Sequence, residues 1–411
     1  MIMAMKESGI EWVGLIPDTW SVIPNKYVMH KEKNLCEKWS GEDVMSLTVN
    51  GVIVRDLQNP TGKMPATFDG YQYVENGDLL MCLFDIDVTP RCVGRVTHDG
   101  VTSPAYSNFK VHDNASRDYF YYYYLMVDNT KELLHLAKNL RHSFTEEQLG
   151  QLKVPMPPLS EQQAIADYLD ETCSKIDEII AEAKASIDEY EKLKQATIDE
   201  NILGYDSVHI KLRQLGSLKN GLNFSHSDDV ANIKFLGVGC FKDNMILREV
   251  DDFTDEHIDF EISEEYLLSN GDIVFVRSNG SKELVGRSLM VENIDYPVTF
   301  SGFCIRFRNM HTELVDNRFL IYYFRTTHFK QLLLKYSNDS TNINNLNQEM
   351  LNAIRINAPV IGEQKLLVKK LEEQVLLIDS LITEKESLIN DLEAYKKSLI
   401  YEVVTGKRRV V

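Results

Sequence analysis

Two polar segments in the second half of the chain hold the side chains best suited to bind a charged, hydrogen-bonding ligand. Residues 277–282 read Arg-Ser-Asn-Gly-Ser-Lys after an apolar run, and residues 337–347 are rich in Asn and Ser. Arginine and lysine bind phosphates or guanine, whereas amide and hydroxyl groups bind the edges of other bases. A solvated turn is the alternative for each segment taken alone. The predicted nucleic-acid contacts in this half are Arg277, Asn279, Ser281, Lys282, Asn342 and Asn344.

Two segments of the first half stand at matching places. Residues 91–95 begin and end with Arg, and residues 139–143 read Asn-Leu-Arg-His-Ser. Because Gly94-Arg95 matches Gly286-Arg287, we interpret residues 91–95 as the counterpart of the first polar segment. Matching positions in two repeated regions favour a pair of binding surfaces over unrelated turns. The predicted contacts in this half are Arg91, Arg95, Arg141 and His142.

The motifs of common catalytic sites are missing from the chain. It has no G-x-G-x-x-G or G-x-x-x-x-G-K-[ST] loop for a nucleotide, no H-E-x-x-H zinc motif and no G-x-S-x-G nucleophile elbow. Residues 59–61, Asn-Pro-Thr, resemble only distantly the Asn/Asp-Pro-Pro-aromatic loop with which amino-methyltransferases grip a base. These blanks predict a binding protein with no catalytic residues, no metal ligands and no cofactor of its own.

The chain contains a repeat with an offset of 202 residues, and the elements expected to position these segments belong to it. Pro157, the pair Glu161-Gln162 and Gly204 recur as Pro359, Glu363-Gln364 and Gly406. Repeats at a fixed offset indicate that the same structural unit is built twice. The chain is therefore predicted to consist of two similar halves.

Each half ends in a long amphipathic helix. From position 161, and again from position 363, apolar residues alternate at spacings of four and three, which is typical of a heptad seam. About forty helical residues span roughly 60 Å, more than the diameter of a small domain, so we expect the two helices to pack as an antiparallel pair. Ordinary core helices are the alternative. The predicted helix seam, also proposed to bind partners, comprises Leu169, Ile176, Ile180, Ile187, Leu371, Ile378, Ile382 and Ile389.

The remaining residues read as two mixed α/β regions. Short apolar or alternating runs bounded by Gly, Asn and Asp are typical of strands, and aromatic stretches at 119–125 and 318–324 read as helices that pack on the sheets. The predicted fold class is α+β: two α/β domains joined by a two-helix antiparallel coiled coil, with a pseudo-twofold internal repeat. The predicted segments are 1–157 and 205–359 for the α/β domains, and 158–204 and 360–411 for the helices.

Composition limits the classes of protein to which the chain can belong. Its 411 residues suggest two or three domains, and six widely spaced cysteines indicate neither a zinc site nor a disulfide framework. We expect no secretion signal, no membrane span and a cytoplasmic location. The net charge is −18, of which residues 161–203 carry −8 and residues 363–404 carry −3. Acidic helices favour a protein partner over DNA, so contact with DNA would rest on local basic groups.

Several phrases then resemble one family, the specificity subunits of type I restriction-modification enzymes. In that family two target-recognition domains alternate with two conserved helices. The likeness runs along essentially the whole chain and includes an opening phrase at 11–20, an entry to each long helix at 157–162 and 359–364, and an ending at 404–407. Ser103-Pro104-Ala105-Tyr106 resembles a phrase of the recognition domains, where the second half has Ser301-Gly302-Phe303 instead.

The resemblance implies a non-catalytic DNA reader. Each recognition domain would read one half of a bipartite target in double-stranded DNA, and the helix pair would set the spacer between the halves. Two modification (methyltransferase) subunits would dock on the helices, and two restriction (translocase/nuclease) subunits would join them. S-adenosylmethionine, ATP and Mg²⁺ would be bound by these partner subunits. The alternatives are an acidic mimic of DNA, a coiled-coil scaffold without sequence-specific DNA binding, and an enzyme with an unfamiliar motif.

Overall fold

The computed structural model describes residues 4–60, 62, 64–137, 142–205, 208–224, 230–242, 245–278, 284–336 and 345–410. The chain divides into two units, which we call unit 1 (Met1–Lys184 with Glu386–Val411) and unit 2 (Ala185–Lys385). Both unit boundaries fall inside long helices, α4 (Leu159–Ile202) and α9 (Ile361–Val404). This division differs from the four predicted segments, whose boundaries stay predictions.

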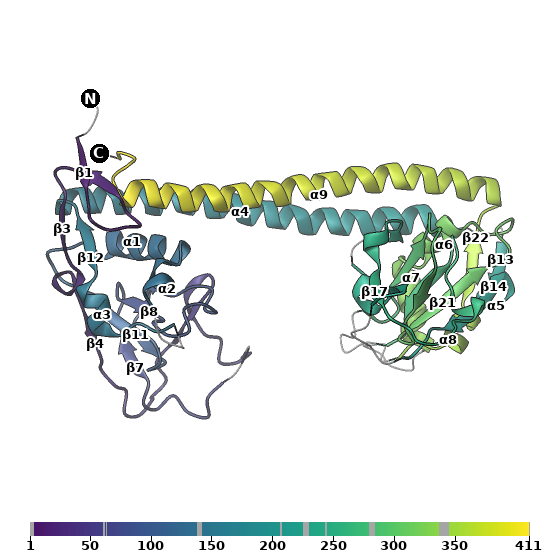
Figure 1. The fold of residues 1–411 in the computed structure, drawn as a ribbon, viewed down its shortest axis with the longest axis horizontal. Coiled ribbons are helices and arrows are strands. Elements are labelled where there is room, and N and C mark those ends of the chain that lie inside the picture. Colours follow the sequence, from purple (N-terminus) through teal and green to yellow (C-terminus); the bar gives the residue numbers. More distant parts are fainter. Residues whose placement is uncertain are drawn as a thin grey trace. The chain divides into compact units, whose positions relative to one another are not determined.

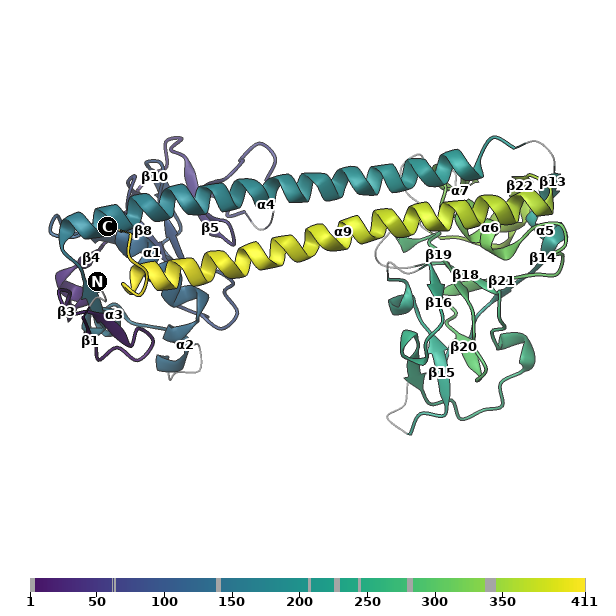
Figure 2. The ribbon, with the colours of Figure 1, turned by 90° about the horizontal axis from the view of Figure 1, so that it is seen from above.

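The two long helices lie side by side within each unit (Figures 1 and 2). In unit 2, Lys194 Nζ donates to Asp379 at 2.6 Å, and Asn201 Nδ2 donates to Gln374 Oε1 at 3.4 Å. Later residues of α4 contact earlier residues of α9, so the two helices run antiparallel. In unit 1, Lys396 Nζ donates to Asp177 at 2.6 Å, so an ion pair joins the two helices there.

The predicted seam residues face the protein interior. Ile187 is half-buried and the other seven are buried. An apolar stripe of this kind stabilises a helix by removing its side chains from water. Their burial assigns them to packing within each unit, so docking of a partner protein would use other side chains of the helices. The buried seam residues are Leu169, Ile176, Ile180 and Ile389 in unit 1, and Leu371, Ile378 and Ile382 in unit 2.

Unit 1 contains two four-stranded sheets and a helical layer. One sheet has the order β4-β11-β8-β9, and the other has the order β6-β5-β10-β7, in which β5 and β10 are parallel. The helix α1 (Arg117–Asn129) lies between α4 and the first of these sheets (Figure 1). The strand bounds are β4 Met29–Glu32, β11 Ser107–Val111, β8 Leu79–Met81, β9 Val93–Arg95, β6 Gly51–Val54, β5 Val44–Thr48, β10 Gly100–Thr102 and β7 Gln72–Val74.

Unit 2 repeats this plan with small differences. Its larger sheet has the order β14-β21-β18-β19-β16 and its smaller sheet the order β17-β15-β20, in which β15 and β20 are parallel. The short helix α6 (Asn317–Tyr323) stands where α1 stands in unit 1. The strand bounds are β14 Gly216–Asn220, β21 Cys304–Asn309, β18 Ile273–Val276, β19 Ser288–Val291, β16 Ile246–Leu247, β17 Thr254–Glu256, β15 Ile233–Leu236 and β20 Val298–Phe300.

The strand that precedes each long helix pairs with a strand near the start of the same α/β domain. In unit 1, β12 (Lys153–Met156) pairs antiparallel with β3 (Ser21–Pro24). In unit 2, β22 (Arg355–Ala358) pairs antiparallel with β13 (Val208–Lys211). Each pairing brings the chain back to the long helix after its α/β domain is complete. The predicted fold class is confirmed in both units.

The aromatic stretches pack on the sheets, as predicted. In α1, Tyr119, Phe120 and Tyr123 are buried, and the Tyr119 hydroxyl donates to the Val404 carbonyl near the end of α9 at 2.9 Å. The apolar run at residues 44–54 forms the antiparallel hairpin β5–β6. All six cysteines are buried and unpaired. No helix of the described residues is both long and apolar enough to cross a membrane.

Candidate nucleic-acid interface

A buried glutamine holds each α/β domain to its long helix. In unit 2, Gln364 Oε1 accepts from the Asp316 backbone N–H at 2.9 Å, and Gln364 Nε2 donates to the carbonyls of Pro359 and Leu314 at 2.8 and 3.0 Å. The Gln364 side chain is fully buried, so these bonds satisfy groups that water cannot reach. Asp316 is the N-cap of α6, and the contact therefore fixes that short helix to α9.

The same bonds recur in unit 1 at an offset of 202. Gln162, also fully buried, accepts from the Ser116 N–H at 2.8 Å and donates to the Pro157 carbonyl at 2.8 Å. Ser116 is the N-cap of α1. In the sequence this glutamine stands out only as part of the repeat. An amide that recurs at the same helix position could have been recognised as a buried contact.

An ion cluster lies beside each glutamine. In unit 1, Arg95 pairs with Asp118 of α1 at 2.5 Å and with Asp170 of α4 at 3.1 Å. In unit 2, Arg318 of α6 pairs with Glu292 at 2.7 Å and also with Glu372 of α9. Burial alone lowers the pKa of both guanidinium groups, but the hydrogen bonds to these carboxylates raise each pKa above its ordinary value. The clusters thus tie one end of the β4-β11-β8-β9 sheet in unit 1, and of the five-stranded sheet in unit 2, to a long helix.

Arg95 therefore lies in an intramolecular cluster at the helix-facing end. Its guanidinium is committed to two carboxylates and also lies over the Tyr121 ring, 5.1 Å from its centroid. Arg91 lies nearer the other end of β9, where it donates to the Tyr121 hydroxyl at 2.8 Å and to the Val49 carbonyl at 3.3 Å. Both arginines hold parts of unit 1 together, and their contact with DNA stays a prediction.

The described ends of the predicted polar segments lie at the opposite end of the larger sheet in unit 2. The Arg277 N–H donates to the Phe303 carbonyl at 2.8 Å, because β18 ends where β21 begins. The Leu346 N–H donates to the Arg277 carbonyl at 2.8 Å, and Gln348 Nε2 donates to Asn220 Oδ1 at 3.0 Å. We call this end, defined by these five residues, the distal edge of unit 2.

The described ends of the two polar segments of unit 2 thus meet at one edge, with Arg277 among them. The Arg277 side chain is half-buried and donates to the Gly302 carbonyl at 3.5 Å. The other predicted contacts of this half lie outside the described residues. They are Asn279, Ser281, Lys282, Asn342 and Asn344.

The distal edge of unit 1 is formed by Leu83, Ala105, His142 and Phe144. The Phe144 N–H donates to the Leu83 carbonyl at 2.8 Å, which reproduces the bond between Leu346 and Arg277. His142 lies in the left-handed region at φ 42°, and its Nδ1 is buried without a hydrogen-bond partner among the described residues. Arg141 lies outside the described residues.

The register of the strands corrects one predicted equivalence. The Val96 N–H donates to the Asp78 carbonyl and the Val291 N–H donates to the Asp272 carbonyl, so Val96 matches Val291. Gly94-Arg95 consequently matches Leu289-Met290, and its predicted match to residues 286–287 is wrong. The loop between the paired strands is one residue longer in unit 2, which shifts the offset beyond it. Arg277 corresponds to Leu83, and Arg91 is not its counterpart.

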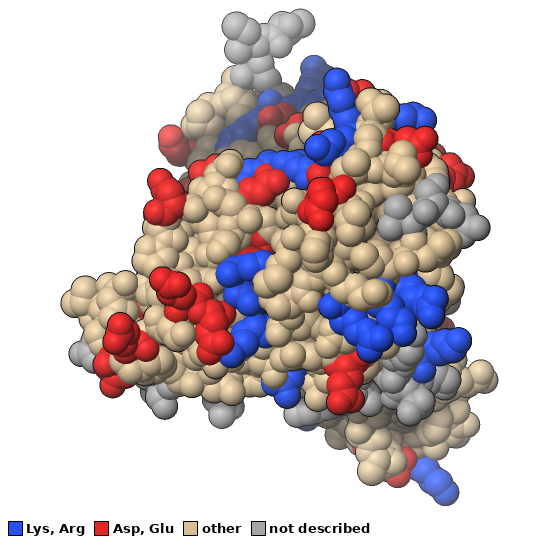
Figure 3. Space-filling view, turned by 90° about the vertical axis from the view of Figure 1, so that its right-hand side faces the viewer, with Lys and Arg blue, Asp and Glu red and all other residues tan. Residues whose placement is uncertain are grey.

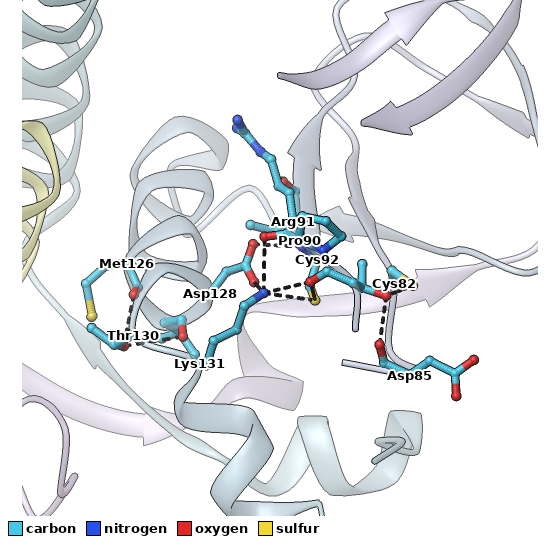
Figure 4. Close-up of polar contacts among 12 residues, drawn as sticks. Cys82, Asp85, Pro90, Arg91, Cys92, Met126, Asp128, Thr130 and Lys131 are labelled. Carbon is cyan, nitrogen blue, oxygen red and sulfur yellow. Dashed lines mark hydrogen bonds and ion pairs between the residues drawn. The ribbon is translucent and has the colours of Figure 1, made fainter. Parts of the chain in front are cut away.

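A polar network fixes the loop that leaves the distal edge of unit 1 (Figure 4). Lys131 Nζ donates to Asp128 Oδ1 at 2.7 Å and to the Thr89 carbonyl at 2.9 Å. Asp128 Oδ2 accepts from the Cys92 N–H at 2.7 Å, and burial raises the pKa of the Cys92 thiol to about 12. The loop between β8 and β9 is therefore held against the end of α1, and Cys92 is a protonated thiol rather than a nucleophile.

Charge on the described surface is mixed. The face drawn in Figure 3 carries Lys and Arg side chains in small groups between acidic and uncharged ones. Among the residues that the structure describes, no three His, Cys, Asp or Glu side chains are arranged to hold a metal ion. The arrangement offers hydrogen-bonding loops and isolated cations, which suit contact with base edges and single phosphates.

Comparison with known proteins places the chain in a family. The model of the type I restriction modification DNA specificity domain matches residues 92–189 and 206–391. The chain is 29% identical over 285 residues to the specificity subunit of the type I restriction enzyme MjaVIII of Methanocaldococcus jannaschii, and 22% identical over 272 residues to that of StySPI of Salmonella potsdam. These matches cover 63% and 62% of this chain, but only 63% and 58% of the two relatives, less than two thirds of either.

Solved structures share the fold. A chain from a structure on complex assembly and conformational transition of the type I R-M system aligns at a TM-score of 0.72 and 12% identity, covering 96% of this chain and 99% of that one. An HsdS subunit from Thermoanaerobacter tengcongensis aligns at a TM-score of 0.52 and 13% identity, covering 96% and 98%. The family model matches more than half of the chain, and the chain therefore belongs to the family of type I restriction-modification specificity subunits.

Proposed function

We propose that this protein is the sequence-reading subunit of a type I restriction-modification complex, and that each unit reads one half of a bipartite DNA target. The observation that carries the proposal is the common plan of the two units. In each, the α/β domain is tied to a long helix at one end of a sheet (β4-β11-β8-β9 in unit 1, the five-stranded sheet in unit 2), and loops begin at the opposite end. A rigid sheet that presents loops at its free end is a suitable base for side chains that read the edges of bases.

The long helices are proposed to set the spacer and to dock the modification subunits. Their apolar seam is buried, whereas the outer face of α4 is dominated by exposed carboxylates that suit a basic surface of a partner. Two similar halves suit two identical partners, since each half offers an equivalent docking site. The exposed acidic residues of α4 are Asp167, Glu171, Asp177, Glu178, Glu182, Asp188, Glu189, Glu191 and Glu200.

We further propose that the chemistry belongs to the partner subunits. The modification subunits would bind S-adenosylmethionine, and the restriction subunits would bind ATP and Mg²⁺. This chain would contribute positioning only, without catalytic residues. A cytoplasmic location follows from that role, since its DNA target and partners are there.

Exchange of residues 205–359 for the equivalent domain of another specificity subunit tests the modular part of the proposal. The chimaera, expressed with its modification subunits, is expected to methylate a target in which one half-site is new and the other is unchanged. The spacer should stay the same because both long helices are kept. A change in both half-sites would contradict independent reading by the two units.

A further inference from the structure

Phe303 presents an exposed aromatic ring at the distal edge of unit 2. The residue is 58% exposed, although it directly precedes the buried strand β21. A single exposed apolar side chain is common on protein surfaces and needs no special explanation by itself. The position of Phe303, where the two polar segments of unit 2 meet, is what makes its exposure informative.

The turn beneath the ring is the same in both units. The Phe303 N–H donates to Ser301 Oγ at 3.2 Å, and the Ala105 N–H donates to Ser103 Oγ at 3.3 Å. The following residue closes each turn, with Cys304 N–H bonded to the Ser301 carbonyl and Tyr106 N–H bonded to the Ser103 carbonyl. Phe303 thus occupies the place of the Ala105 methyl group, and at this position of the turn only unit 2 has a ring.

Neighbouring groups hold the turn in place. The Phe303 carbonyl accepts from the Arg277 N–H at 2.8 Å, and the Gly302 N–H donates to the Leu222 carbonyl at 2.7 Å. A Cβ atom at Gly302 would lie 2.0 Å from Asn223 Oδ1, so any larger residue there would displace the Asn223 side chain. The backbone groups of Phe303 are satisfied within the protein, which leaves the ring as the part available to a ligand.

The chemistry around the ring fits the major groove of DNA. The Arg277 guanidinium donates to the carbonyl of Gly302, the residue next to Phe303. The Asn223 side chain lies against the same Gly302. Arginine and asparagine form hydrogen bonds with guanine and adenine, whereas the one apolar group in that groove is the thymine 5-methyl. An aromatic ring placed among polar readers therefore matches thymine.

We propose that Phe303 contacts the 5-methyl group of a thymine in the half-site read by unit 2, a contact that unit 1 lacks because Ala105 stands in its place. The inference rests on the proposed function and adds a residue that determines specificity. At 58% exposure the Phe303 side chain is accessible to a base edge. Insertion between base steps is the other way in which an exposed Phe contacts DNA, and it bends the duplex.

A double-mutant cycle between protein and DNA tests this contact. The full chain, purified with its modification subunits, is titrated with duplexes of its methylation target in which each thymine of the second half-site is replaced in turn by uracil, which lacks the methyl. One replacement is expected to weaken binding by the wild-type complex about fourfold, the factor that corresponds to burying one methyl group. With Phe303→Ala, binding of the thymine duplex falls at least as much, and that replacement then has no further effect.

Met310→Ala is the matched control. Met310 is 63% exposed just after the other end of β21, and its substitution should leave the response to uracil unchanged. If uracil at every position affects the wild-type and Phe303→Ala complexes equally, Phe303 is not a thymine contact. If the wild-type complex bends the duplex and the Phe303→Ala complex does not, Phe303 inserts between base steps, and the proposed methyl contact is wrong. A wild-type complex without any sequence preference would instead overturn the proposed function itself.

Discussion

In unit 1 the arginine that reaches the long helix comes from a strand, whereas in unit 2 it comes from the short helix. Arg95 of β9 bridges Asp118 of α1 and Asp170 of α4, while Arg318 of α6 bridges Glu292 and Glu372 of α9. The acidic residue of the long helix is the same in kind and stands at the same place in the repeat. The arginine lies on a different element of the α/β domain in each unit, but in both it pairs with the acidic residue of the long helix.

This difference shows which feature of the joint is constrained. The carboxylate on the long helix pairs with an arginine of the α/β domain in both units. That arginine can lie either on a strand, as Arg95 does, or on the short helix, as Arg318 does. The buried glutamine beside the cluster allows no such exchange, because its amide satisfies backbone groups of fixed geometry. At the distal edge the two units diverge more freely, with Leu83 and Ala105 in place of Arg277 and Phe303.

Removal of the glutamine should have the largest effect on stability. Gln364→Leu leaves one buried N–H and two carbonyls without partners, and Gln162→Leu leaves one N–H and one carbonyl. We expect a loss of about 2–4 kcal/mol in the free energy of unfolding, larger for Gln364. Urea denaturation followed by circular dichroism measures it. The exposed neighbour Gln163→Leu serves as the control, and a loss under about 1 kcal/mol for both buried glutamines would show that the joint does not depend on them.

Arg277→Ala should sharpen the comparison between the distal edges. The substitution is expected to relax recognition in the second half-site only, at a cost of about 1–3 kcal/mol in discrimination between bases. Sequencing of methylated adenines reads both half-sites at once. Arg213→Ala is the control, since this exposed arginine precedes β14 at the helix-facing end of the sheet. Unchanged methylation at both half-sites would show that Arg277 is not a base contact.

Charge reversal tests whether the two ion clusters are interchangeable. Arg95→Ala and Arg318→Ala should each cost about 1–2 kcal/mol, because the side chains are about 30% exposed and each bridges two carboxylates. The double substitution Arg95→Glu with Asp118→Arg moves the arginine to the helix position that Arg318 occupies in unit 2, two residues after the N-cap, and should recover most of the loss. Thermal unfolding of the three variants measures both effects. No recovery in the double variant would mean that the two corners differ in geometry.

The sequence predicted what the repeat holds constant. The offset of 202 residues persists from α3 (Glu146–Gln151) through the long helices because those segments have equal lengths in both halves, and the seam and the glutamines follow from it. Aromatic residues in α1 and α6 were interpreted correctly as packing, because five consecutive aromatics on a helix cannot all face a ligand.

Inside the α/β domains the offset changes, and there sequence matching failed. Strand pairing matches Gly94-Arg95 with Leu289-Met290, three residues beyond the predicted match at 286–287. The ion pairs of Arg95 join segments far apart in sequence, so no local pattern could distinguish it from a DNA contact. Phe303 was visible as a departure from the Ser-Pro-Ala-Tyr phrase, but its exposure depends on the fold of the turn.

The central claim is that two similar units read the two halves of one DNA target for a methylating partner. Long-read sequencing of adenine methylation in cells that express this chain with and without its modification subunits tests it most directly. We expect a bipartite motif with a fixed spacer only when both are present. Methylation of the same motif without this chain, or its absence when all subunits are expressed, would contradict the claim.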